Sequence, residues 1–192
     1  MMKNLQVLLT NLIGLSEIEW NAFQQQLVRK EYKSKEIVIE SGKTAQNIYF
    51  IEYGLMRTYH LEDGKEINTY FACDDQFIST YSSFISQTPS FEILEAIEES
   101  IVYALSFETL NTLYETSSKF EKLGRILAEK NYLCVLDRTY AMQTKSAKEK
   151  YLAFIKTNDK KIVQRIPQLH IASFLGIAPE SLSRVRKEIS IS

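Results

Sequence analysis

The chain has 192 residues, of which 45% are hydrophobic and 24% charged, with 23 Lys and Arg against 24 Asp and Glu. This composition is typical of a globular protein and excludes disordered, collagen-like and rod-shaped coiled-coil classes. No apolar run reaches the roughly 18 residues of a membrane-spanning helix, and the segment from Met1 to Ser16 lacks a secretion signal. We therefore expect a cytoplasmic protein that has no membrane partner.

Cysteine and histidine are scarce in the chain. Cys73 and Cys134 are too few for a disulfide framework, an iron–sulfur cluster or a four-thiolate zinc site. His60 and His170 are far apart in the sequence, and neither has a cluster of carboxylates around it. We therefore expect no catalytic residue, no metal site and no cofactor, and the sequence argues against an enzyme.

Charge is distributed unevenly along the chain. Residues 1–143 carry 13 Lys and Arg against 20 Asp and Glu, a balance of −7, whereas residues 144–192 carry 10 against 4, a balance of +6. A basic segment on an acidic body suits a protein of which only one part approaches a polyanion. Chance segregation is the alternative, and charge alone does not decide between the two. The best domain boundary lies near Thr144, which gives predicted domains of residues 1–143 and 144–192.

The first stretch, residues 4–31, is predicted to be helical. Ser16 followed three positions later by Glu19 is a capping-box pattern, which marks the start of a helix. Trp20, Phe23 and Leu27 then repeat at helical spacing, so this face should belong to the core.

Residues 36–106 have the pattern of short strands. Segments rich in β-branched and aromatic residues alternate with glycine-containing turns, and the Asp63-Gly64 pair is typical of a tight hairpin. Many short strands at this spacing favour an antiparallel barrel or roll. The predicted strands are Ile37–Ile39, Ile48–Ile51, Leu55–Leu61, Glu66–Phe71 and Ile101–Leu105.

A long helix, about residues 117–143, is predicted within the glycine-poor stretch from Phe107 to Thr157. It carries two apolar stripes, which implies two packing partners, its own domain and a second copy of itself. We predict that the dimer seam consists of Phe120, Leu123, Leu127, Cys134 and Ala141. The adjacent stripe contains Ile126, Leu133, Leu136 and Tyr140.

Residues 168–187 match the pattern of a helix-turn-helix at seven key positions. The pattern requires a small residue where the helices touch, a glycine for the left-handed turn, and apolar residues elsewhere. Pro179 suits the first position of the second helix, because proline lacks the amide hydrogen that would be unpaired there. The matching residues are Ile171, Ala172, Leu175, Gly176, Ile177, Leu182 and Val185.

The second helix of this motif has an outward face that suits the major groove of DNA. Arg184 can bind a guanine, Glu180 can accept a hydrogen bond from a cytosine amino group, and Ser181 can serve a base or a phosphate. Basic residues nearby are better suited to contact phosphates. Such contacts position the protein on the duplex but do not depend on the base sequence. The full set predicted to contact DNA is Glu180, Ser181, Arg184, Lys187, Arg186, Gln168, His170, Lys145 and Lys148, with His170 expected to be exposed.

The order of a glycine-punctuated β-roll, a long helix and a helix-turn-helix resembles the Crp/Fnr superfamily of bacterial transcription regulators. The motifs that carry the resemblance are Ile37 through Gly42, Ile48-Tyr49-Phe50-Ile51, Gly54, Asp63-Gly64-Lys65-Glu66, Asp75-Gln76-Phe77, and Pro179-Glu180-Ser181-Leu182-Ser183-Arg184.

This resemblance implies an α+β protein. Its N-terminal antiparallel β-roll would be a double-stranded β-helix like a cyclic-nucleotide-binding domain, followed by a dimerisation helix and a small DNA-binding domain. It further implies a homodimer that reads a pseudo-palindromic site on double-stranded DNA, with RNA polymerase as a further partner. The wing that usually follows the second helix is expected to be shortened or missing.

The sequence departs from the family at the phosphate-binding cassette. Nucleotide-binding members carry Phe-Gly-Glu and, about ten residues later, Arg-Ser/Thr-Ala, whereas this chain has Ile78-Ser79-Thr80 and Ser90-Phe91-Glu92. Because both charged anchors are missing, we expect that cyclic nucleotide is not the effector. The pocket either holds another small molecule or is packed shut. Its predicted residues are Thr80, Tyr81, Ser82, Ser83, Ser90 and Phe91.

Two other classes of function compete with DNA binding. One is a ligand-sensing or protein-interaction module whose helix-turn-helix has decayed, against which Arg184 and the +6 balance argue. The other is a β-roll enzyme of the cupin type, which needs clustered His and carboxylate ligands, and the roll contains only His60.

Overall fold

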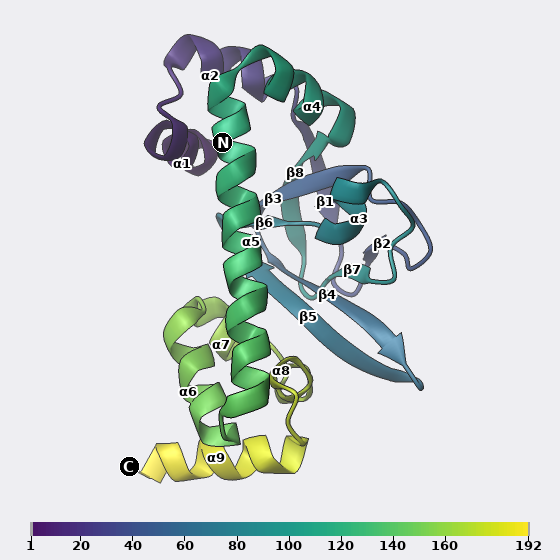
Figure 1. Cartoon of the computed structure of the whole chain (residues 1–192), viewed down its shortest axis with the longest axis vertical. Coiled ribbons are helices and arrows are strands. Elements are labelled where there is room, and N and C mark those ends of the chain that lie inside the picture. The colour runs from purple at the N-terminus through teal and green to yellow at the C-terminus, as the bar shows by residue number, and fades with distance from the viewer. Residues whose placement is uncertain (1, 192) are drawn as a thin grey trace.

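The computed structural model describes residues 2–191, with the side chains of residues 190 and 191 left out. A β-roll packs beside one long helix, with short helices at both ends of that helix (Figure 1). The elements are α1 (Lys3–Ile13), α2 (Glu17–Gln24), β1 (Val28–Tyr32), β2 (Ile37–Ile39), β3 (Asn47–Tyr53), β4 (Leu55–Glu62), β5 (Lys65–Cys73), β6 (Phe77–Ile78), α3 (Tyr81–Ser86), β7 (Ile93–Ala96), β8 (Ser100–Ser106), α4 (Phe107–Thr116), α5 (Ser118–Thr144), α6 (Ala147–Thr157), α7 (Lys160–Arg165), α8 (Gln168–Leu175) and α9 (Pro179–Ile191).

The roll consists of two four-stranded antiparallel sheets, in the orders β1-β8-β3-β6 and β2-β7-β4-β5. The hairpin between β4 and β5 closes where Glu62 pairs with Lys65. Its two turn residues, Asp63 and Gly64, have φ angles of 50° and 74°, the conformation that an Asp-Gly pair favours. The α+β class and the antiparallel roll predicted from the sequence are therefore confirmed.

The N-terminal helical segment is shorter than its pattern suggests. Ser16 forms the predicted capping box with Glu19, and Trp20 and Phe23 are buried. The chain leaves the helical conformation after Gln24, however, and Val28–Tyr32 pairs with β8 as an edge strand. The prediction of a helix up to residue 31 is wrong because strand pairing with residues 100–104 overrides the local pattern.

The long helix α5 has 27 residues, and one side of its first third packs on the N-terminal helices. Phe120 is 4% exposed and packs on Phe23, with ring centroids 4.9 Å apart. Gly124 allows Tyr114 of α4 to approach, since a Cβ atom at this glycine would overlap the Tyr114 ring. The remainder of α5 extends past the roll toward the C-terminal helices (Figure 1).

The C-terminal helices α6 to α9 pack around their own apolar residues and on the roll. A second core cluster joins Phe154, Ile171 and Leu182 of these helices to Leu55 of β4 and Phe71 of β5. Helix α5 ends at Thr144, where the charge balance predicts a domain boundary, but the second core crosses that boundary. In the described residues no helix is long and apolar enough to cross a membrane.

A close approach at Gly54 fixes the turn between β3 and β4. Its φ angle is +130°, and a Cβ atom there would overlap the side chain of Ser100. The Ser100 hydroxyl accepts a hydrogen bond from the Leu55 amide, 3.3 Å from N to Oγ, and the Gly54 amide donates to Asp74 Oδ1 at 2.7 Å. These hydrogen bonds hold the backbone at Gly54 close to Ser100. The two therefore cannot move apart to make room for a Cβ atom.

We predict that Gly54→Ala destabilises the chain more than Gly64→Ala does, as measured by urea unfolding. Gly64 has a φ angle of +74° but no atom within 4 Å of its Cβ position. Its substitution should cost only the backbone penalty, about 1–2 kcal/mol. Gly54→Ala adds a steric overlap to that penalty, and equal losses in the two variants would contradict the close approach.

Candidate nucleic-acid interface and ligand cavity

The turn between α8 and α9 has the geometry that the sequence pattern predicts. Gly176 has a φ angle of 62°, and its amide donates to the carbonyl oxygens of Ala172 and Ser173. The Ile177 amide also donates to the Ala172 carbonyl, at 3.0 Å, so the freed carbonyls at the end of α8 are satisfied. Pro179 then begins α9. The two helices are held at a fixed angle by this short turn.

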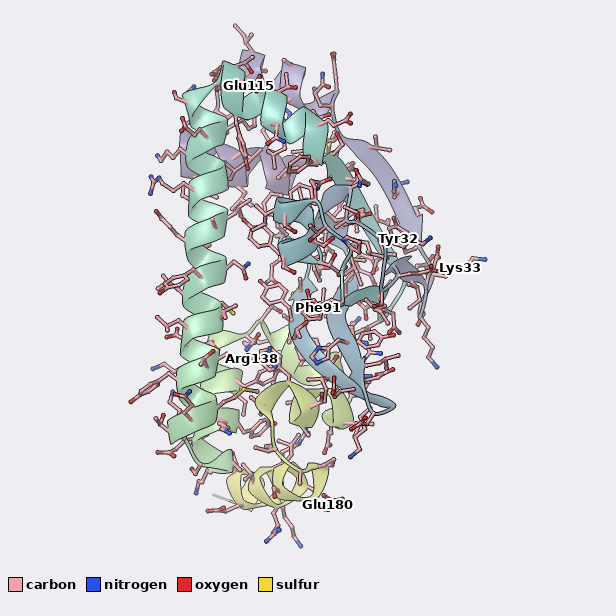
Figure 2. All side chains as sticks on the ribbon, turned by 45° about the vertical axis from the view of Figure 1, so that its right-hand side comes forward. Tyr32, Lys33, Phe91, Glu115, Arg138 and Glu180 are labelled. Carbon is pink, nitrogen blue, oxygen red and sulfur yellow. The ribbon has the colours of Figure 1, made fainter. Side chains whose placement is uncertain are left out.

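Helix α9 has an inner face that is apolar and an outer face that is polar. Leu182 and Val185 are 0% and 8% exposed and pack in the second core. Glu180, Arg184 and Lys187 are exposed and, at positions i, i+4 and i+7, share one side of the helix. Glu180 lies at the beginning of α9, at the far end of the molecule from α1 (Figures 1 and 2).

Several of the other residues predicted to contact DNA have partners within the chain. The Lys148 ammonium forms an ion pair with Glu188. The Arg186 guanidinium is half-buried and lies 6.0 Å from the Tyr151 ring centroid. Ser181 and Lys145 are also half-buried, whereas Gln168 is exposed. The exposed polar face of α9 therefore consists of Glu180, Arg184 and Lys187, and Gln168 at the start of α8 is also exposed.

The prediction that His170 is exposed toward DNA is wrong. Its side chain is 19% exposed and faces the roll. The Nη1 atom of Arg57 lies 3.1 Å from Nδ1 of His170, and Oε2 of Glu66 lies 3.6 Å from the same nitrogen. The adjacent Ser173 also faces the roll, where its hydroxyl accepts from the Asn68 amide and donates to the Glu66 carbonyl. One side of α8 is therefore used for docking on β5.

Arg57 organises the polar contacts beneath α8. Its side chain is 4% exposed, and it donates to Glu95 through Nε and Nη2 and to Glu66 through Nη1, at 3.1, 2.7 and 2.7 Å. Burial acts to lower the Arg57 pKa, but the hydrogen bonds that Arg57 donates to the two carboxylates, together with their charges, outweigh it and raise that pKa. A buried charge with this geometry is expensive to unpair, at about 3–5 kcal/mol. The cluster therefore fixes where α8 sits on the roll.

A cavity of about 610 Å³ lies between the roll and α5. It is lined by Tyr81, Ser82 and Phe91 from the predicted effector set, and by Arg138, Lys130 and Cys134 of α5. Figure 2 labels Phe91 and Arg138, which approach this cavity from the roll and from α5. Three of the six predicted effector residues therefore border an open space between the roll and α5.

The other predicted effector residues are not available to a ligand. Ser83 donates to the Thr88 carbonyl and accepts from the Ala45 amide, and the Ser90 hydroxyl is bonded to the backbone of Glu92. Thr80 is fully buried, and its hydroxyl has no hydrogen-bond partner in the described residues. Ser83 and Ser90 therefore support the loops on either side of α3, whereas Thr80 is enclosed in the fold, and none of the three lines the cavity.

The predicted dimer residues divide into buried and accessible ones. Phe120 and Leu123 are 4% and 3% exposed within a single chain, so including them in the dimer seam is wrong. Leu127 and Ala141 are half-buried and Cys134 is exposed. The more exposed apolar surface of α5 belongs to the neighbouring stripe, with Tyr132, Leu133, Leu136 and Tyr140 at 66%, 55%, 48% and 60% exposure. The packing of α1 and α2 decides which stripe faces outward.

The roll and the following helices match known proteins. Residues 29–117 match the family described as Cyclic nucleotide-binding domain. Among solved structures, FixK2 from Bradyrhizobium japonicum superposes with a TM-score of 0.76 at 17% identity, over 86% of this chain and 85% of that one. The chain has the fold of a Crp/Fnr regulator. The resemblance predicted from the sequence is thereby confirmed at the level of the fold.

Two further structures support the same fold assignment. CLP from Xanthomonas campestris, described as a c-di-GMP responsive global regulator, has a TM-score of 0.67 at 18% identity over 90% of both chains. A crp/fnr-family protein from Eubacterium rectale has a TM-score of 0.69 at 18% identity, over 93% of this chain and 85% of that one. None of the curated protein sequences matches the chain. In the described residues, no three His, Cys, Asp or Glu side chains gather as a metal site would require.

The docking of α8 should depend on pH through His170. Burial, followed by the charge of Arg57, lowers the pKa of His170 below its usual 6.5, although Glu66 and Glu95 oppose this. The folded chain therefore holds the ring neutral, with Nδ1 accepting from Arg57, whereas the unfolded chain takes up a proton near pH 6.5. Stability is complete above that pH and decreases as the pH falls below it.

We predict that the free energy of unfolding declines between pH 7.5 and 5.5 and that His170→Gln removes part of this decline. The measurement is urea unfolding at several pH values within that range. Glu66, whose usual pKa of 4.5 is lowered by its hydrogen bond with Arg57, titrates below the range. His60→Gln, outside the Arg57 cluster, is the control. A His170→Gln profile identical to the wild type would contradict the buried neutral ring.

Proposed function

We propose that the chain is a DNA-binding transcription regulator that acts as a homodimer and places α9 of each copy in the major groove of a pseudo-palindromic site. The main support is the exposed face of α9, on which Glu180, Arg184 and Lys187 lie on one side of a helix whose other side is buried. A helix presented at the surface in this way fits the width of the major groove of B-form DNA.

The chemistry of this face suits base recognition. The guanidinium of Arg184 can donate two hydrogen bonds to O6 and N7 of a guanine, and the Glu180 carboxylate can accept one from the amino group of a cytosine. Both side chains are exposed, so neither has to leave a core to reach a base. Pro179 supplies no charge at the first helical position, so the preference for sequence would depend mainly on these two residues.

The charge of the C-terminal segment supports approach to a polyanion. Residues 144–192 have a balance of +6, whereas the body has −7, so a duplex is attracted to one end of the molecule. Lys156 at the end of α6 and Lys160 at the start of α7 are exposed and suit phosphate contacts. Lys161 does not, because its ammonium lies 2.8 Å from Asp74 Oδ1 and 2.7 Å from Glu98 Oε1.

The exposed stripe of α5 supports dimerisation. Tyr132, Leu136 and Tyr140 are spaced four residues apart and lie on one face of the helix, with Leu133 beside them. A contiguous apolar surface of this kind marks an interaction site. Two copies joined along α5 would be related by a two-fold axis, so that their α9 helices meet a palindromic site as a symmetric pair.

We propose further that the regulator acts in the cytoplasm with RNA polymerase as a further partner. We also propose that cyclic nucleotide does not regulate it. Arg57 is a buried arginine of the roll, but it is already paired with Glu95 and Glu66. The wall of the roll cavity carries the carboxylates of Glu92 and Asp75. Lys130 and Arg138 also line that cavity, but they come from α5, so the cassette segments themselves lack the arginine that usually pairs with a cyclic phosphate.

Arg184→Ala tests whether α9 reads bases. On a duplex selected from a random library, we expect its affinity to fall about 10- to 100-fold, the equivalent of losing a contact worth about 1–3 kcal/mol. On random duplex the loss should be much smaller. Titration by fluorescence anisotropy measures both.

Arg125→Ala is the control for this experiment, since Arg125 is an exposed arginine of α5 that is paired with Glu129. This variant should bind both duplexes as the wild type does. If Arg184→Ala weakens the two duplexes equally, the arginine contacts only phosphate, and base reading by α9 is wrong. Failure of the wild-type chain to select any sequence would favour the protein-interaction module instead.

Leu136→Asp tests the dimer face. Leu136 is 48% exposed, so the charge should not disturb the fold of one chain but should separate two chains that pack along α5. We expect monomers by sedimentation equilibrium, with an unchanged circular dichroism spectrum. Leu152→Asp, at a leucine of α6 with 44% exposure, should remain dimeric. A Leu136→Asp variant that stays dimeric would place the interface elsewhere.

A further inference from the structure

A second cavity lies where α5 meets the C-terminal helices. Its volume is about 510 Å³, and its wall is formed by the end of α5, α6, α8 and β5. We call it the hinge cavity, because residues on both sides of the α5–α6 junction line it. It shares Tyr70, Gln76, Cys134, Arg138 and Met142 with the roll cavity but extends away from the predicted effector residues.

The floor of the hinge cavity is aromatic. The ring centroid of Phe174 lies 5.2 Å from that of Phe71 and 5.8 Å from that of Phe154, and Phe71 and Phe154 are 6.5 Å apart. Phe71 of β5 and Phe154 of α6 are each only 3% exposed, so the accessible part of this floor is mainly Phe174 of α8, which the other two rings support from below. Such a surface favours a planar apolar molecule.

The rim of the hinge cavity has more positive than negative charge. Arg138, Lys145 and Lys150 line it, and within the described residues none of them is within ion-pair distance of a carboxylate. The opposing carboxylates are Asp137 and Asp159. Asp159 is held in place because it accepts from the Lys161 amide at 2.7 Å and caps α7, and with both carboxylates counted the rim still has three cations against two anions. A ligand would therefore encounter a positive rim.

Arg138 is the cation best placed to bind a ligand. Its Nη1 and Nη2 atoms donate to the backbone carbonyls of Thr69 and Asn68, both at 2.9 Å, and its guanidinium carbon lies 4.6 Å from the Phe174 ring centroid. Its Nε atom is buried and has no partner among the described residues. Figure 2 shows this side chain extending from α5 toward the C-terminal helices.

Among the described residues no carboxylate lies within ion-pair distance of Arg138, and the charge of Glu92 acts on it only from farther away. The contacts to two carbonyls and one ring hold the guanidinium in place, but they supply no opposite charge. Burial accordingly lowers the pKa of Arg138. An anion in the hinge cavity would restore the pairing that buried charges normally have, and would do so where water screens the interaction only weakly.

We propose that the hinge cavity binds a small anionic molecule with a planar apolar body, whose carboxylate, sulfonate or phosphate faces Arg138 and Lys150 while its body packs against the aromatic floor at Phe174. The site is separate from the DNA-reading face and from the phosphate cassette of the roll. Its occupant would touch both α5 and α6.

The test compares two fluorescent probes with the same ring system, 8-anilino-1-naphthalenesulfonate, which is anionic, and N-phenyl-1-naphthylamine, which lacks the sulfonate. We expect the full-length chain to bind the anionic probe saturably. Arg138→Gln and Lys150→Gln should each weaken that binding about tenfold, as the loss of a charge-assisted hydrogen bond would. Binding of the neutral probe should change less than twofold.

Two control variants make the result specific, and a second test variant covers the case in which the first does not fold. Arg125→Gln removes an exposed arginine of the same helix and should leave both probes unaffected. Leu136→Asp removes part of the exposed apolar stripe and should not change the affinity for the anionic probe, which shows that the probe is not reporting on that stripe. Lys150→Gln decides the matter if Arg138→Gln does not fold, because Arg138 also anchors β5.

The chemical class of the anion follows from competition. Benzoate and phenyl phosphate should both displace the anionic probe, and the stronger competitor identifies carboxylate or phosphate as the preferred group. The proposal is overturned if the anionic probe fails to saturate, if it binds equally well to wild type and Lys150→Gln, or if both probes weaken together. None of these measurements requires DNA, so they remain decisive whether or not the chain binds a duplex.

Discussion

The position of the C-terminal helices depends on their contact with the β4–β5 hairpin. Leu55 and Phe71 of the hairpin belong to the same apolar core as Phe154, Ile171 and Leu182, so the roll and the last four helices bury surface against each other. Without this shared core, a short junction at residues 145–146 would be the main link between α5 and α6, and α9 would have no fixed direction. The direction in which α9 presents its exposed side chains therefore depends on this packing.

Two polar clusters at the edges of that core make the contact specific. Beneath α8, Arg57 connects Glu95 and Glu66 with His170. At α7, Lys161 joins Asp74 and Glu98. Arg57 of the roll and Lys161 of α7 therefore hold the C-terminal helices against the roll. Their partners are distant in the sequence, so only the structure shows that these two cations are used in this way.

The sequence predicts well those features that local rules determine. The Asp63-Gly64 hairpin, the capping box at Ser16 and the glycine turn at Gly176 all occur where their patterns place them, because each needs only neighbouring residues. The long helix was also predicted to within about one residue at each end, since 27 residues of continuous helical pattern leave little ambiguity.

Features that depend on distant partners were not predictable. The strand Val28–Tyr32 exists because β8 lies beside it, and the inward direction of His170 is set by Arg57, which is 113 residues away in the sequence. The choice between the two apolar stripes of α5 likewise depends on α1 and α2, which bury Phe120 and Leu123. A single sequence shows that both stripes are apolar, but not which of them a neighbouring helix covers.

The central claim is that two copies of α9, held apart by paired α5 helices, enter successive major grooves on one side of a duplex. Hydroxyl-radical footprinting on a genomic fragment that the chain selects tests this most directly. The account predicts two protected blocks of similar sequence in inverted orientation, with centres about one helical turn, roughly 10 base pairs, apart. A single protected block, or uniform protection that does not depend on sequence, would contradict it.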